Sequence, residues 1–144
     1  MNGEAPTSRP SVQLPVGPLV ASIGAVLLIV SLFLDWYDRI TGFTAFEVLD
    51  LVLVALALLT IASLLSGLGL VRPLLSAEAT LGVAVLALVT VASQIVNDPP
   101  AAAGVGGPGK DVGIWLALAA TGLMVGGAVL GYARISLAVE PRDR

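Results

Sequence analysis

Four carboxylates stand close together in the sequence and are the residues best suited to chemistry: Asp35, Asp38, Glu47 and Asp50. Glu47 and Asp50 are three residues apart, so they share one face if the segment is helical. Asp50 directly precedes an apolar run, and ionisable residues at a membrane edge are candidates for a functional site. Together with Gln94 at a similar depth, Asp35, Glu47 and Asp50 predict a polar pocket for a cation, a basic peptide or a lipid headgroup.

The same carboxylates also fit a purely structural interpretation, which the sequence leaves open. Glu47 follows Thr44 at the spacing of a capping box and would then only start a helix. Asp35 and Arg39 are four residues apart and can pair on a helix. The carboxylate of Asp50 can reach the water at the membrane surface.

Other kinds of chemistry find little support in the residue types. The chain contains neither Cys nor His, which removes disulfides, thiolate catalysis and the commonest metal ligands. The segment 104–110 matches the first seven positions of a P-loop, yet Asp111 replaces the hydroxyl that binds Mg²⁺. No nucleophile accompanies the carboxylates. We therefore expect no enzymatic activity, no metal or other cofactor, and no nucleotide or nucleic acid as a partner.

The elements that position these residues are read from four apolar runs. Of the 144 residues, 57% are hydrophobic and 12% charged, against about 45–50% and about 25% in soluble domains. Charge-free runs of 18 to 22 residues cover 16–34, 51–71, 79–96 and 112–133. Because roughly 20 helical residues cross the hydrocarbon layer, each run is long enough for one crossing. The partner implied by this composition is a lipid bilayer.

The sequence thus predicts an all-α protein, an integral membrane four-helix bundle with up-down-up-down topology. Start and stop signals place the spans at about 16–34, 45–71, 74–96 and 112–134. The signals are the capping box at Thr44, Pro73 and Ser76 at the start of the third span, Asn97 and the prolines that follow it at the end of that span, and Asp111 before the fourth. Residues 1–15 are expected to form a disordered tail and 140–144 a second, short tail.

The distribution of cations predicts the orientation of the spans. An even number of crossings puts both termini on one side of the membrane. Five arginines fall on that side: Arg9, Arg72, Arg134, Arg142 and Arg144. Only Arg39 and Lys110 fall on the other side, so both termini are expected in the cytoplasm and the protein in the plasma membrane. Trp36, Tyr37 and Trp115 are then expected at the outer interface as an aromatic belt.

Small residues recur at four-residue intervals on the fourth span. Gly122 and Gly126 form one such pair, and Gly127 and Gly131 form another. This spacing allows two helix backbones to approach closely inside a membrane. Two interpretations remain open: contact between helices of the same chain, and contact with a second copy or a larger membrane complex.

A resemblance to a known group of proteins rests on two segments and the apolar span that follows them. The segments are 31–37 (Ser-Leu-Phe-Leu-Asp-Trp-Tyr) and 42–47 (Gly-Phe-Thr-Ala-Phe-Glu). The chain resembles small uncharacterised four-span membrane proteins of high-GC Gram-positive bacteria. In these an aromatic pair closes the first helix and an aromatic-rich turn opens the second. Many have proline at the position of Asp35. The resemblance implies the four-span architecture and no established activity.

Two functional hypotheses follow from these observations. The first is a non-enzymatic structural or accessory membrane protein that associates with itself or with a larger membrane complex. The alternative is a small transporter, channel or ligand sensor that uses the acidic cluster at the outer surface.

Overall fold

The computed structural model of the protein describes residues 16–45, 48–97 and 109–139. In chain order the elements are α1 (Val16–Ser31), β1 (Asp35–Tyr37), β2 (Ile40–Thr41), α2 (Gly42–Ala45), α3 (Leu49–Gly67), α4 (Ala77–Val96) and α5 (Val112–Val139). The described residues are mainly helical, in agreement with the predicted all-α class. The predicted tails 1–15 and 140–144 lie outside the described residues.

Three of the helices are long and apolar enough to cross a membrane: α3, α4 and the part of α5 up to Ala133. The first predicted span, α1, is apolar but has only 16 residues, which corresponds to about 24 Å of helix. It ends at Ser31, where the prediction placed its end at residue 34. The chain then turns into the short hairpin formed by β1 and β2.

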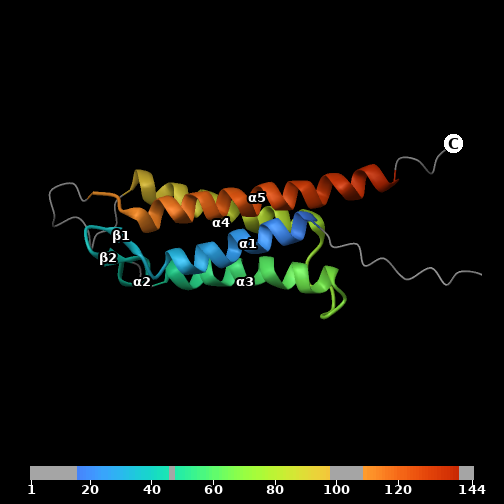
Figure 1. Cartoon of the computed structure of the whole chain (residues 1–144), viewed down its shortest axis with the longest axis horizontal. Coiled ribbons are helices and arrows are strands. Elements are labelled where there is room, and N and C mark those ends of the chain that lie inside the picture. The colour runs from blue at the N-terminus through green and yellow to red at the C-terminus, as the bar shows by residue number, and fades with distance from the viewer. Residues whose placement is uncertain (1–15, 46–47, 98–108, 140–144) are drawn as a thin grey trace, which may run out of the picture.

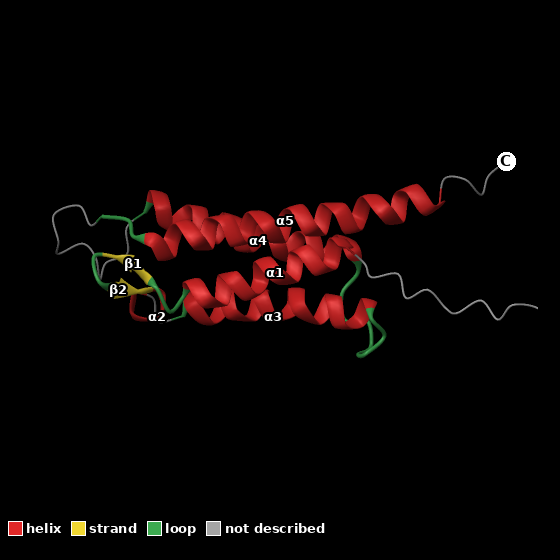
Figure 2. Cartoon of the chain, in the orientation of Figure 1, coloured by secondary structure: helices red, strands yellow, loops and turns green. Residues whose placement is uncertain are grey.

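The four longer helices run side by side, as Figure 1 shows. The contact between α1 and α5 is the most extensive, and α1 also packs on α3, while α4 packs on α5 and α3. The hairpin and α2 lie at one end of the molecule, and the start of α1 and the α3–α4 connection lie at the other (Figure 2). These are called here the hairpin end and the α1-start end.

The core between the helices consists largely of alanines and of a few large side chains. Leu28, Leu53, Val91 and Met124 are fully buried, one from each of the four longer helices. Buried alanines occur on every one of these helices, and their small size lets the backbones approach one another.

Some predicted helix limits are confirmed. Ser76 is the N-cap of α4, and its Oγ accepts a hydrogen bond from the Ala79 backbone N–H at 3.2 Å. α4 ends at Val96 with Asn97 as its C-cap. Asp111 directly precedes α5, but its Oδ1 accepts the Val112 N–H at 3.0 Å and not the N–H of the second or third helical residue, so its capping role stays a prediction.

The predicted start of the second span is wrong. α3 begins at Leu49 rather than at residue 45, and its N-cap residue Val48 makes no side-chain capping bond. Thr44 belongs to the short helix α2, and its Oγ1 lies 2.9 Å from Oγ1 of Thr41. The hydroxyl of Thr44 therefore bonds back to the hairpin, and Glu47 lies outside the described residues.

Candidate functional site

The residues of the predicted acidic pocket lie in three different settings at the hairpin end. Asp35 is exposed on β1. Asp50 is buried in the first turn of α3, and its Oδ1 accepts the Leu51 N–H at 2.8 Å. Gln94 is half-buried on α4 and donates from Nε2 to Ser93 Oγ at 3.1 Å. Within the described ranges no hydrogen bond or ion pair joins these three, so the pocket stays a prediction.

Two aromatic side chains from β1 fill the interior at this end. Trp36 and Tyr37 are fully buried, so the prediction that they form an interfacial belt is wrong for both. Trp36 Nε1 donates to the Ser31 carbonyl at 2.8 Å, and the Tyr37 hydroxyl donates to the Gln94 carbonyl at 2.6 Å. Only Trp115 of the predicted belt is exposed. Trp36 and Tyr37 are instead a plug that ties α1 to α4.

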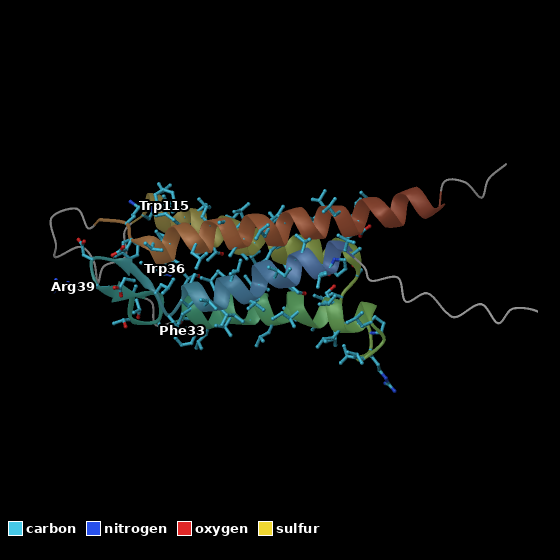
Figure 3. The ribbon with its side chains drawn as sticks, viewed as in Figure 1. Phe33, Trp36, Arg39 and Trp115 are labelled. Atoms are coloured by element: carbon cyan, nitrogen blue, oxygen red, sulfur yellow. The ribbon has the colours of Figure 1, made fainter. Side chains whose placement is uncertain are left out.

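The hairpin is held in place by the segment that precedes α5. The Asp38 Oδ2 accepts the Gly109 N–H at 3.1 Å, and the Asp111 N–H donates to the Trp36 carbonyl at 2.9 Å. Tyr37 and Lys110 form an antiparallel bridge. Figure 3 shows Arg39 at the tip of this hairpin. The hairpin thereby connects the first long helix, α1, to the segment that leads into the last one, α5.

The hairpin turn explains why Asp35 and Arg39 do not form the predicted helical pair. Asp38 and Arg39 connect β1 to β2, and both have positive φ, 23° and 70°. A two-residue turn with positive φ at both positions matches the right-handed twist of the flanking strands. Asp35 and Arg39 therefore lie on a hairpin and its turn, where a four-residue spacing does not align side chains as it does on a helix.

A cavity of about 260 Å³ opens at the opposite, α1-start end. All four longer helices line it, with Gly17, Pro18 and Ala21 from α1, Thr60 and Ser63 from α3, Ala77 and Thr80 from α4, and Gly127, Ala128 and Gly131 from α5. Ala21 and Thr60 are almost completely buried, whereas Pro18, Ala77 and Gly131 are half-buried. This gradient places the mouth near the first turns of α1 and α4.

The cavity is closed toward the hairpin end. On each helix the next fully buried large residues in that direction are Leu28, Leu53, Val91 and Met124. Beyond them lie the buried Trp36 and Tyr37. Large apolar side chains therefore fill much of the core between the cavity and the hairpin end.

The four glycines of the predicted packing face have two different surroundings. A Cβ at Gly127 would clash with the Ala21 backbone nitrogen and lie 2.6 Å from the Gly17 carbonyl oxygen. A Cβ at Gly131 would meet only the Pro18 ring, at 3.5 Å. A Cβ at Gly122 or at Gly126 would meet nothing within 4 Å. Gly127 and Gly131 thus serve the contact with α1, and Gly122 and Gly126 face outward.

The chain was compared with family models, curated proteins and solved structures. None of them matches. The resemblance to small four-span proteins therefore remains an expectation from the sequence, and functional inference for this chain rests on its own geometry.

Neither the cavity nor the plug of Trp36 and Tyr37 was predicted from the sequence. The hydroxyl residues Thr60, Ser63 and Thr80 gave a signal, because polar side chains inside apolar helices need a partner or a cavity. Their meeting point depends on how α3 crosses α4, which the sequence pattern does not specify. For the plug the signal was a short alternation of aromatic and β-branched residues around Asp38 and Arg39, and the strands have only three and two residues.

Proposed function

We propose that the chain is a four-helix multi-pass protein of the plasma membrane that has no enzymatic activity and associates with itself. The observation that carries the membrane part is that its helices are apolar on their outward faces as well as inside. Exposed side chains of α1, for example, are Val16, Leu19, Ile23, Val26 and Val30. In water such surfaces would aggregate, whereas in lipid they are solvated.

The short helix α1 completes a crossing together with the residues that follow it. Leu32, Trp36 and Tyr37 are fully buried and continue the apolar path beyond Ser31. The hairpin end then lies at the outer surface, and the α1-start end lies at the cytoplasmic surface, as the positive-inside rule indicates. Both termini are cytoplasmic in this proposal.

Self-association is assigned to the outward face of α5. Exposed residues recur there at intervals of four and three: Trp115, Ala119, Gly122, Gly126 and Val129. This is the spacing of a helix-packing seam, and its centre consists of small residues, unlike the exposed face of α1. An outward glycine in a helix costs up to about 1 kcal/mol relative to alanine, and among the described residues nothing lies within 4 Å of a Cβ at Gly122 or Gly126.

The occupant we propose for this face is a second copy of the same chain. The seam carries no charge, and a strip of small residues is complementary to itself, which suits a twofold interface in which each copy contributes the same patch. Dispersion between closely approaching backbones supplies the attraction in lipid.

Cysteine cross-linking in native membranes tests the proposal, because the chain has no cysteine of its own. Ala119→Cys places a small thiol in the seam, and mild oxidation is expected to convert most of the protein into a disulfide-linked dimer. Ile23→Cys, on the exposed face of α1, is the matched control and should remain monomeric. Adding Gly126→Leu to Ala119→Cys should lower the dimer yield several-fold, since the larger side chain separates the helices.

Two results would count against self-association. One is the absence of cross-links at residue 119, and the other is equal cross-linking at residues 119 and 23, as random collision would give. A cross-link at residue 119 to a different protein would indicate that this face binds a component of a larger membrane complex and not a second copy of the chain.

A further inference from the structure

The hydrogen atoms of the three hydroxyls that line the cavity are all committed to bonds within the protein. Thr60 Oγ1 donates to the Leu56 carbonyl at 3.0 Å, and Thr80 Oγ1 donates to the Ser76 carbonyl at 3.0 Å. Ser63 Oγ lies 3.1 Å from Thr80 Oγ1. Since the single hydrogen of Thr80 is already used, Ser63 must be the donor in that pair.

The cavity is therefore rich in acceptors and has no free side-chain donor among its lining residues. Each hydroxyl oxygen has two lone pairs. Both lone pairs of Thr60 Oγ1, both of Ser63 Oγ and one of Thr80 Oγ1 receive no hydrogen bond from the described residues. A ligand that fits this wall must supply the hydrogen.

The rest of the lining sets the other properties of a ligand. It consists of glycine, alanine and proline, and none of the lining residues is charged. The volume of about 260 Å³ exceeds the roughly 150 Å³ that is enough for benzene in an engineered apolar cavity of another protein. A neutral molecule of about two fused rings is the size that fits.

We propose that this cavity binds a compact, uncharged, mainly apolar molecule that carries one hydrogen-bond donor, a hydroxyl or an N–H group. The ligand enters from the α1-start end, places its apolar body against Ala21, Gly127 and Ala128, and donates to the hydroxyl oxygens of α3 and α4. The site is separate from the α5 seam and does not depend on self-association.

The test uses the full-length protein in nanodiscs and equilibrium dialysis against empty nanodiscs, which account for partitioning into lipid. The probes are 2-naphthol, which has a hydroxyl, and 2-methoxynaphthalene, which has the same ring system without a donor. We expect saturable binding of 2-naphthol at one molecule per chain. The methoxy compound should bind about fivefold more weakly, which corresponds to the loss of one neutral hydrogen bond.

Variants distinguish the cavity from the protein surface. Thr60→Val retains the shape of the wall but removes an acceptor, and it should weaken 2-naphthol binding several-fold with little change for the methoxy probe. Ala128→Leu fills the cavity and should abolish binding of both probes. Ala77→Leu, at the mouth, should do the same if Ala128→Leu does not fold. Thr121→Val is the matched control, because Thr121 is a buried threonine on α5 that bonds to the Ala117 carbonyl and does not line the cavity.

The proposal is overturned if 2-naphthol distributes equally between protein-loaded and empty nanodiscs, which would mean that the cavity holds only water or lipid. It is equally overturned if the two probes bind with equal affinity and Thr60→Val leaves both affinities unchanged.

Discussion

Gly127→Ala is expected to destabilise the protein by about 2–3 kcal/mol, whereas Gly126→Ala, one residue earlier, should be neutral or stabilising by up to about 1 kcal/mol. The physical reason is the different space around the two glycines. A Cβ at Gly127 runs into the backbone of α1, and neither helix can yield without losing its contact with the other. Within one chain a Cβ at Gly126 meets no described atom within 4 Å, so in the detergent-solubilised monomer it contributes only its favourable helix propensity.

The free energy of unfolding is measured by titrating the protein in mild detergent with SDS and following its helical circular dichroism. Gly122→Ala, also on the outward face, serves as the control and should behave like Gly126→Ala. Gly24→Ala should behave like Gly127→Ala, because its Cβ would lie 2.5 Å from the Ala120 carbonyl oxygen. Equal effects at residues 126 and 127 would mean that α1 does not contact α5 along this face.

Trp36→Ala is expected to cost about 3–5 kcal/mol of unfolding free energy, the usual range for deleting a fully buried large aromatic side chain. The indole is fully buried in the core at the hairpin end, and a methyl group would leave a cavity there. Trp36→Phe should cost less, about 1–2 kcal/mol, because the ring remains while the bond from Nε1 to the Ser31 carbonyl is lost.

Trp115→Ala is the matched control, since Trp115 is 52% exposed. Its loss should change the stability of the detergent-solubilised monomer by about 0.5 kcal/mol or less. Hydrogen exchange gives a second readout for Trp36→Ala. The amides of Gly109 and Asp111, which bond to the hairpin, should exchange much faster in that variant. An equal loss of unfolding free energy in Trp36→Ala and Trp115→Ala would indicate that Trp36 lies at the membrane interface, as the sequence predicted.

The sequence predicted those parts of the fold that depend on composition and length. The runs in α3, α4 and α5 contain more apolar residues than a helix of that length in a soluble protein. In lipid a helix satisfies all backbone hydrogen bonds within such a run. Ser76 was predicted as a cap because its chemistry is local to the first turn of α4.

The features that the sequence did not predict depend on tertiary contacts. Trp36 suits both a membrane interface and a buried plug, and the choice depends on whether α4 and the segment before α5 lie close enough to bond to the hairpin. Gly126 and Gly127 are neighbours in sequence, and α1 alone decides which of the two faces inward. The cavity, likewise, results from small residues meeting at one level on four helices, and no single span carries that information.

We propose that four helices cross the membrane, with the hairpin end outside and the α1-start end inside. Single cysteines introduced at Arg39, Arg72 and Ser8, followed by a membrane-impermeant maleimide on intact cells, test it most directly. Arg39→Cys, at the hairpin tip, is expected to be labelled in intact cells. Arg72→Cys, between α3 and α4, and Ser8→Cys, before α1, should be labelled only after the membrane is permeabilised. Labelling of Ser8→Cys and Arg39→Cys from the same side would contradict the account, because α1 would then not cross the membrane.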